Sequence, residues 1–351
     1  MKYTLLILLP IFFIAVMHGE TRHEGKIDEA FYIVDVPDEP NGNVMFIARG
    51  FRPSFFPLSA VYEVDTDFYQ TLLAEGWIIA STSFRTNGWV VEKGGLDIIA
   101  LRDHIAKSIH PIDFSVVYGE TMGGGVAIWL GENHPEFFQG ILGLGAHLFP
   151  EPGNGEMESD TLAPVFNKDP KIPVLFLANA GEIASSSAYA SSVNDGDLKP
   201  VTWSVDRPGH VNVNSAERLA AFRALIAWTE GEVPDSTAEA KIDRSPESIA
   251  ASSSKVAAGN IRRIRPLYGN LYSNLVAKDL KKLGISLGDK FTFIHGSESY
   301  DIEYAKAYSD VEIGAWVAFI DPEGYVQISR NYANAGETLG ATKGDPILIK
   351  K

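Results

Sequence analysis

Short apolar runs alternate with amphipathic segments through the first two thirds of the chain. Short runs rich in branched residues are typical of buried strands, whereas apolar positions three or four residues apart are typical of helices. The pattern predicts strands at residues 31–36, 44–48, 77–81, 116–118, 140–144, 173–177 and 201–205, and helices at 68–75, 96–108 and 216–228. Because strands that alternate with helices form βαβ units, we expect a mostly parallel sheet with flanking helices, an α/β fold.

The pattern changes after residue 230. Residues 231–259 are polar and poor in aromatic side chains, which is typical of a linker. Turn-forming residues then separate short apolar runs at 290–294, 315–320, 325–329 and 346–349, which predict a small β-rich domain. We therefore expect an α/β domain at residues 28–234, a linker at 235–259 and a β-rich domain at 260–351.

Residues 1–19 are predicted to be a signal peptide. Lys2 precedes an apolar run from Leu5 to Met17, which gives the charged start and the short hydrophobic core of such a segment. The run is too short for a comfortable transmembrane span, but Met17 marks a cleavage site weakly, which leaves an uncleaved anchor open. We expect export to the periplasm or beyond, without other membrane contact, and the absence of cysteine is compatible with this.

Charge and motif spacing exclude several kinds of partner. The 351 residues carry a formal net charge of −15, so the phosphates of nucleic acids would be repelled. The densest basic cluster, Arg262-Arg263-Ile264-Arg265, is interpreted as a solvated face or an interdomain contact. We expect no metal and no cofactor, because no His-x-x-x-His occurs and Gly123-Gly124-Gly125 lacks the Lys-Ser/Thr of a phosphate-binding loop.

The stretch from Val116 to Gly125 carries the strongest signal for chemistry. A β-branched run leads into Gly119-Glu120-Thr121-Met122-Gly123-Gly124, and a helical pattern follows. This order is typical of a nucleophile elbow, in which a sharp strand-to-helix turn projects a hydroxyl above a parallel sheet. Thr121 is therefore the candidate nucleophile. Serine is usual at this position, and the additional methyl group of threonine restricts χ1 and competes for space.

A hydroxyl nucleophile needs an imidazole within hydrogen-bond reach and a carboxylate to orient that imidazole. His210 lies in a loop after the strand predicted at 201–205 and before the last helix of the domain, where the base of this architecture belongs. His147 follows the strand after the elbow; it is the reserve base and a candidate lining residue of the pocket.

The candidate acid is Glu182, just past the end of the strand predicted at 173–177. Asp195 and Asp206 remain alternatives, and a glutamate in a loop can simply be solvated. The order nucleophile, acid, histidine along the chain agrees with that of the nucleophile-elbow architecture.

Backbone N–H groups are expected to form an oxyanion hole. One is that of Met122, directly after the nucleophile, and the other is that of Gly50 or Phe51, after the strand at 44–48. Trp89, in a loop segment, is a second candidate for lining the substrate pocket, although tryptophans are more often part of the core.

Together these segments resemble bacterial secreted alpha/beta hydrolases of esterase type over about residues 30 to 234. The resemblance rests on the ordered motifs Asn41-Gly42-Asn43-Val44, Arg49-Gly50-Phe51, Thr86-Asn87-Gly88-Trp89, the elbow, and Gly209-His210 with the helix that follows. It implies an esterase in which Thr121 is the nucleophile, Glu182 the acid and His210 the base. Two positions depart from the family pattern, because Arg49 replaces a histidine and Thr121 replaces a serine.

Residues 260–351 resemble the C-terminal domain of S-adenosylmethionine hydroxide adenosyltransferases. The resemblance rests on Tyr268-Gly269-Asn270, Tyr308-Ser309-Asp310-Val311, Asp321-Pro322-Glu323-Gly324 and Asn334-Ala335. It implies that Tyr268, Asn270 and Ala335 match positions that hold adenine in that family. Pro266 stands where the family has an aspartate, and Pro322-Glu323 stands where it has a hydroxyl-bearing pair, so the amino-acid end of such a ligand lacks its partners.

The sequence thus predicts an exported enzyme that hydrolyses a small carboxylic ester through an acyl-enzyme. Two alternatives stay open: a non-catalytic binding or scaffold protein, and a protein that binds or transfers an adenosyl group. The C-terminal domain is also a candidate surface for oligomerisation.

Overall fold

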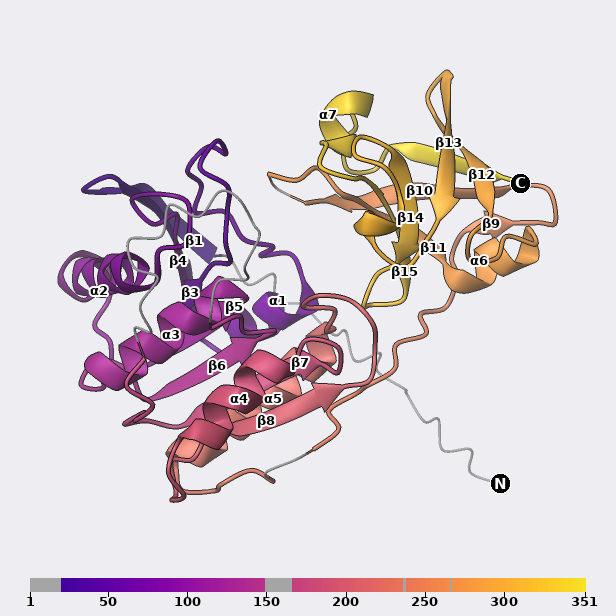
Figure 1. Cartoon of the computed structure of the whole chain (residues 1–351). Coiled ribbons are helices and arrows are strands. Elements are labelled where there is room, and N and C mark those ends of the chain that lie inside the picture. The colour runs from indigo at the N-terminus through magenta and orange to yellow at the C-terminus, as the bar shows by residue number, and fades with distance from the viewer. Residues whose placement is uncertain (1–19, 149–165, 236–237, 266) are drawn as a thin grey trace, which may run out of the picture.

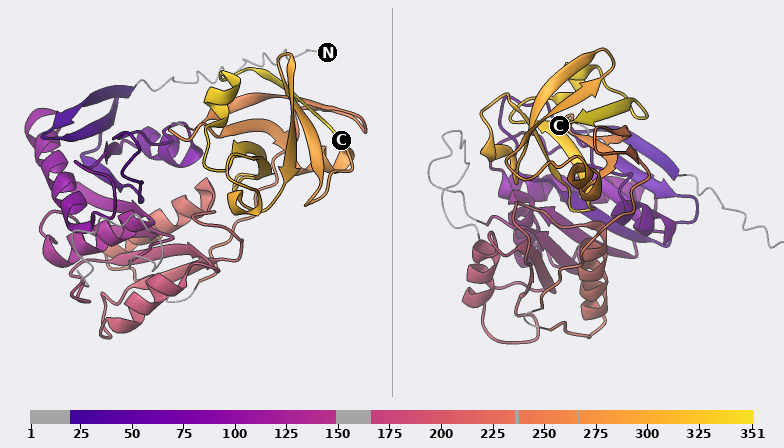
Figure 2. Two further views of the ribbon diagram at one scale, coloured as in Figure 1. Left: turned by 45° about the horizontal axis from the view of Figure 1, so that its top comes forward. Right: turned by 90° about the vertical axis from the view of Figure 1, so that its right-hand side faces the viewer.

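A computed structural model describes residues 20–148, 166–235, 238–265 and 267–351. The predicted signal peptide and Pro266 lie outside these residues. Each helix in the described ranges is too short or too polar to cross a bilayer. Two eight-stranded sheets divide the chain into two domains that lie side by side (Figures 1 and 2).

The first sheet has the strand order β1-β2-β4-β3-β5-β6-β7-β8. Its strands are β1 (Glu20–Ile27), β2 (Ala30–Pro37), β3 (Asn43–Ala48), β4 (Ile78–Thr82), β5 (Phe114–Glu120), β6 (Gly140–Leu144), β7 (Val174–Asn179) and β8 (Val201–Val205). The strands from β4 to β8 in this order are parallel, and β1 and β2 form an antiparallel edge. The predicted mostly parallel sheet is confirmed. The sheet begins before the expected boundary at residue 28, because β1 pairs with β2 along its whole length.

Helices cover both faces of this sheet (Figure 1). They are α1 (Asp67–Ala74), α2 (Val91–Ser108), α3 (Met122–Asn133), α4 (Ala184–Ser192) and α5 (Ser215–Thr229). Alternate residues of a strand point to opposite faces. Val44 and Phe46 accordingly pack with α2, α3 and α4 in one core, whereas Met45 and Ile47 pack with α1 and α5 in the other.

Part of the predicted linker belongs to the edge of the first domain. The backbone N–H of Ser204 in β8 donates to the Ala238 carbonyl (3.1 Å), and the Ala240 N–H donates to the Ser204 carbonyl (2.8 Å). The Ile242 N–H donates to the Glu217 carboxylate (2.8 Å). The first part of the linker is therefore held along β8 and α5.

The second domain is a barrel. Its elements are β9 (Ala251–Ser252), β10 (Ala257–Ile264), β11 (Leu271–Val276), α6 (Ala277–Lys282), β12 (Lys290–His295), β13 (Glu298–Tyr304), a short 3-10 helix (Tyr308–Asp310), β14 (Trp316–Ile320), β15 (Tyr325–Arg330), α7 (Ala335–Leu339) and β16 (Pro346–Lys350). The strands follow the order β11-β15-β14-β13-β12-β16-β10-β9, and an additional pairing of β10 with β11 closes the ring. The predicted β-rich domain is confirmed, and closure leaves only the short β9 outside the ring.

Ion pairs and a hydrogen bond join the two domains. Glu63, in the loop between β3 and α1, pairs with Arg263 and with Arg265 (Nε to Oε1, 2.5 Å) at the end of β10. Glu323, between β14 and β15, accepts a hydrogen bond from the backbone N–H of Ser215 at the start of α5 (2.5 Å). Of the two interpretations of the basic cluster at 262–265, the interdomain contact therefore holds for Arg263 and Arg265.

Candidate active site

The four polar side chains of the candidate site follow four neighbouring parallel strands. Thr121 comes directly after β5, His147 follows β6, Glu182 follows β7 and His210 follows β8. The carboxyl ends of parallel strands lie at one edge of a sheet, which is where open α/β sheets place their ligands. The topology thus brings these residues to one edge of the first sheet.

The backbone at Thr121 has the sharp geometry of an elbow. Its φ of 51° and ψ of −117° place a non-glycine residue in a strained region, at a free-energy cost of about 1–3 kcal/mol. Glycines allow the chain to close around it. A Cβ on Gly123 would lie 1.9 Å from the Ala48 carbonyl oxygen, and one on Gly119 would lie 2.2 Å from the Gly123 carbonyl oxygen.

The Thr121 methyl group faces the predicted oxyanion loop. Its Cγ2 lies 2.3 Å from the position that a Cβ on Gly50 would take, so only glycine fits there. Within the described part of the chain, the Thr121 hydroxyl makes no hydrogen bond to His210. The hydroxyl and the imidazole thus share one end of the sheet without being in direct hydrogen-bond contact.

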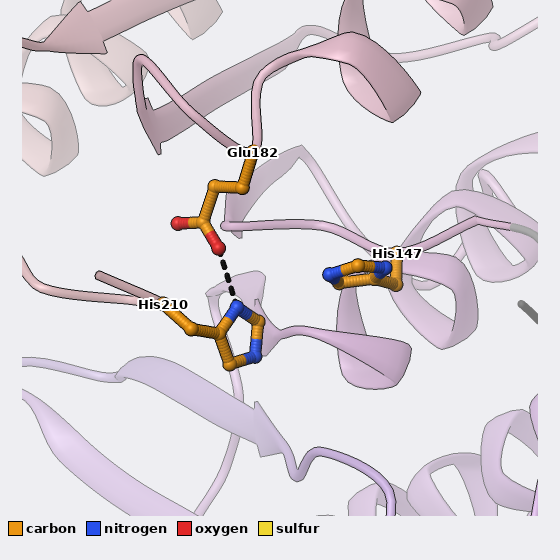
Figure 3. A group of neighbouring side chains, drawn as sticks. All are labelled: His147, Glu182 and His210. Carbon is orange, nitrogen blue, oxygen red and sulfur yellow. Dashed lines mark hydrogen bonds and ion pairs between the residues drawn. The ribbon is translucent and has the colours of Figure 1, made fainter. Parts of the chain in front are cut away.

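Glu182 and His210, the predicted acid and base, are hydrogen-bonded to each other. The Nδ1 atom of His210 is hydrogen-bonded to Oε2 of Glu182 (Figure 3). The other oxygen, Oε1, accepts from the backbone N–H of Val211 (3.0 Å) and of Asn179 (3.3 Å). Burial raises the pKa of Glu182, but the hydrogen bond and charge of His210 and the two backbone donors outweigh it, so the pKa is lowered overall. Glu182 is therefore held as a carboxylate that can orient the imidazole.

His147 lies next to this pair. Its backbone N–H donates to the Thr121 carbonyl (3.1 Å), and its ring meets that of His210 edge to face, with the centroids 5.2 Å apart. Figure 3 shows the two imidazoles on neighbouring loops, with Glu182 beside them. His147 therefore lines the space around His210.

The predicted oxyanion donors lie where the chain leaves β3 and enters α3. Among the residues that the structure describes, the N–H groups of Met122, Gly50 and Phe51 have no acceptor. N–H groups in the first turn of a helix lack intrahelical partners, so that of Met122 is free to bind an anion. Phe51 and Trp89 are half-buried at the edge of the core that contains Met122.

Arg49 has a structural role in place of the histidine of the esterase pattern. Its guanidinium donates to the carbonyls of Ser83 (2.7 Å), Gly50 (2.9 Å) and Thr86 (3.0 Å), and it stacks on the ring of Phe84 (4.6 Å). Burial, together with the positive charge of Arg52, lowers the pKa of Arg49. The Arg49 side chain thus holds the Gly50 carbonyl and the loop that contains Ser83 and Thr86.

Sequence reasoning missed the residues that hold the histidine loop. The side chain of Asn179 accepts from the Asn212 N–H (2.7 Å) and donates to the Asn212 carbonyl (3.0 Å). Arg207 donates to that same carbonyl (2.8 Å) and pairs with Glu217. The capping box that Glu217 forms with Asn214 at the start of α5 is visible as Asn-x-x-Glu in the sequence. This motif could have indicated that Glu217 helps to hold the loop that precedes α5.

A second missed group lies directly before the nucleophile. Oε1 of Glu120 accepts from the Tyr118 hydroxyl (3.0 Å) and from Arg218 (3.0 Å). Arg218 also donates to the Tyr118 hydroxyl (2.6 Å). This polar network joins the end of β5 to α5 and so braces the elbow.

The three adenine-type positions of the barrel are engaged within the protein. Asn270 is buried and donates to the Tyr308 hydroxyl (2.8 Å), and Ala335 is fully buried in the core of the barrel. Tyr268 lies between the domains, with its ring 6.1 Å from that of Phe56 and below the guanidinium of Arg265. The amide of Asn270 is thus paired and Ala335 has no polar side chain, whereas Tyr268 is partly exposed.

Comparison with known proteins divides the chain in the same way. Residues 267–348 match the family model of the SAM hydroxide adenosyltransferase C-terminal domain. The barrel resembles this domain. A fluorinase from Nocardia brasiliensis is 29% identical over 94 residues, which are 26% of this chain and 31% of that enzyme. This chain thus spans less than a third of the relative's length.

The structural neighbours that span the α/β domain include hydrolases. Dienelactone hydrolase from Anabaena variabilis is 15% identical, with a TM-score of 0.40, over 61% of this chain and 96% of that chain. A ferulic acid esterase is 12% identical, with a TM-score of 0.45, over 61% and 98% of the two chains. Acylaminoacyl peptidase from Pyrococcus horikoshii is 14% identical, with a TM-score of 0.47, over 66% and 43%.

Proposed function

We propose that the protein hydrolyses carboxylic esters through an acyl-enzyme on Thr121. The observation that carries the proposal is the strained Thr121 backbone, set between unpaired N–H groups and a joined glutamate and histidine pair. Strain at such a position persists only where the surrounding structure imposes it, and it is concentrated at functional sites.

The proposed reaction has two halves. The Thr121 Oγ1 attacks the ester carbonyl while His210 takes its proton, and the N–H groups of Met122 and of Gly50 or Phe51 stabilise the resulting oxyanion. The intermediate then collapses, and the alcohol leaves with the proton from His210. Water repeats the sequence on the acyl-threonine, which releases the acid and restores the hydroxyl. Glu182 stabilises the imidazolium in both halves.

Hydrolysis of p-nitrophenyl acetate by purified protein tests the proposal. Thr121→Ala and His210→Ala should reduce kcat to background, and Glu182→Gln should reduce it by about 10⁴-fold, the loss typical when the orienting carboxylate becomes an amide. His134→Ala is the matched control, because this half-buried histidine follows the other end of α3 from Thr121, where it contacts Glu136 (3.4 Å) and the ring of Trp129, and the variant should hydrolyse the ester as the parent does. Turnover in Thr121→Ala equal to that of the parent would refute the assignment.

One observation favours the alternative of a non-catalytic binding protein. The Thr121 methyl group packs against Gly50, on the side where the oxyanion must bind. We therefore expect Thr121→Ser to raise kcat, since it removes this methyl group and keeps the hydroxyl. A parent without any turnover, together with an active Thr121→Ser, would favour the non-catalytic function.

A further inference from the structure

Three side chains of the candidate site form a set of ligands that the proposed ester hydrolysis does not explain. His147, Glu182 and His210 each offer one nitrogen or oxygen atom, and these atoms all lie within 4.8 Å of one another. Ester hydrolysis requires only one imidazole and one carboxylate. The second imidazole, that of His147, has no role in a catalytic triad.

Two imidazoles and one carboxylate are a known ligand set for zinc. Zinc binds histidine nitrogen at about 2.0–2.1 Å and carboxylate oxygen at about 2.0–2.2 Å, and its open sites use three protein ligands with a fourth position for water. Small side-chain shifts would bring the three atoms to such distances. His210 has room to move, since 52% of its side chain is exposed.

The surroundings of the ligands are also those of a metal site. Metal-binding carboxylates are usually oriented by further hydrogen bonds. Oε1 of Glu182 is held by the Val211 and Asn179 N–H groups, which leaves Oε2 to face the histidines (Figure 3). The backbone of His147 is fixed by its hydrogen bond to the Thr121 carbonyl. Two of the three ligands thus have fixed supports.

We propose that His147, Glu182 and His210 bind a divalent transition-metal ion, for which zinc is the best match. The ion would take the place of the hydrogen bond that joins Glu182 to His210. A metal-bound His210 cannot accept the proton of Thr121, so the ion and the ester reaction compete for the same imidazole. This inference concerns the same residues as the proposed function, but binding does not require turnover.

Titration of the chelator-treated full chain with zinc, followed by calorimetry, tests the proposal. The parent should bind one zinc ion per chain. His147→Ala and Glu182→Gln should each weaken binding by at least about tenfold, since even the loss of a supporting residue has an effect of that size. His295→Ala is the matched control: His295 contacts one carboxylate, that of Asp345 (3.0 Å), and this variant should bind zinc as the parent does.

A spectroscopic measurement on the parent tests the proposal without depending on whether the variants fold. Cobalt(II) bound at this site should give the intense visible absorption of a four-coordinate ion. No zinc binding by the parent, a weak six-coordinate cobalt spectrum, or unchanged binding in His147→Ala would each overturn the proposal. Absence of p-nitrophenyl acetate turnover in the chelator-treated parent, together with zinc binding, would refute the ester reaction alone, so the two failures are distinguishable.

Discussion

The elbow of the α/β domain and the adenine-type positions of the barrel differ in hydrogen bonding. Backbone N–H groups at the elbow lack acceptors, whereas the Asn270 side chain of the barrel is bonded within the protein. At the elbow, the Met122 and Phe51 N–H groups have no acceptor in the described part of the chain, although they lie beside the candidate nucleophile. In the barrel, Asn270 is already bonded to Tyr308. Binding sites keep polar groups available for a ligand, whereas groups that are satisfied internally contribute to stability instead.

Two barrel residues at positions of the adenosyltransferase pattern contact the α/β domain, one that departs from the pattern and one that matches it. Glu323, which stands where that family has a hydroxyl-bearing pair, accepts from the Ser215 N–H. Tyr268 packs near Phe56, in the loop that follows the predicted oxyanion donors. Both residues therefore contribute to the contact between the two domains of this protein.

The largest expected effect is at the elbow. Gly123→Ala would place a Cβ 1.9 Å from the Ala48 carbonyl oxygen, which is backbone and cannot rotate away. We expect the free energy of unfolding to fall by more than about 3 kcal/mol, beyond the usual range for overpacking, as measured by urea denaturation. Gly181→Ala is the control, since a Cβ there meets nothing within 4 Å. Equal stability of the two variants would contradict the tight elbow.

The elbow was predictable from the sequence because its constraints are local. Glycines at 119, 123 and 124 around one hydroxyl, after a β-branched run, indicate a tight strand-to-helix turn, and the order of Glu182 and His210 followed from the architecture. Helix α4 was not predicted, because its serine-rich sequence from Ala184 to Ser192 has no apolar stripe. Strand β1 was not predicted either, since its residues are mostly polar and exposed.

Long-range contacts were beyond the sequence pattern for a different reason. The basic cluster near Arg263 was compatible with a solvated face or with an interdomain contact, and only the position of Glu63, 200 residues away, decides between them. Arg49 was visible as a departure from the esterase pattern, but its partners lie in a loop more than 30 residues further along the chain. Spacing along a single chain does not encode such pairs.

The ion pairs between the domains give the next largest effect. Burial raises the pKa of Glu63, but the positive charges of Arg265 and Arg263 outweigh it and lower the pKa to about 2, from an ordinary value of 4.5. This difference corresponds to about 3 kcal/mol in favour of the folded state. It is fully present above pH 4.5 and is lost as the pH falls through about 2, because the unfolded chain takes up the proton first.

Glu63→Gln should therefore unfold at a lower denaturant concentration at pH 7 and lose less stability than the parent on acidification. Denaturation series at neutral and acidic pH measure both effects. Glu29→Gln is the matched control, because its pair with Lys26 is exposed and such pairs contribute little; it should leave the midpoint unchanged. A Glu63→Gln variant as stable as the parent would show that the ion pairs of Glu63 with Arg263 and Arg265 contribute no stability.

The smallest expected effect tests the barrel side of the comparison. Asn270→Ala removes one buried hydrogen bond, and the Tyr308 hydroxyl keeps its second donor, Gln327 (2.8 Å). We expect the free energy of unfolding to fall by about 1 kcal/mol, the usual net value of such a bond. Asn194→Ala is the control, since this asparagine is exposed, and it should match the parent in the same denaturation series.

Calorimetry with adenosine completes this test, because a ligand site and a satisfied interior respond differently to the same substitution. With Asn270 bonded to Tyr308 and Ala335 enclosed in the core, adenosine would have to break an existing hydrogen bond and open packed structure in order to bind. We therefore expect no heat of binding with either the parent or Asn270→Ala. Heat with the parent that disappears in Asn270→Ala would mean that the barrel has kept its ligand site, and the contrast with the elbow would then fail.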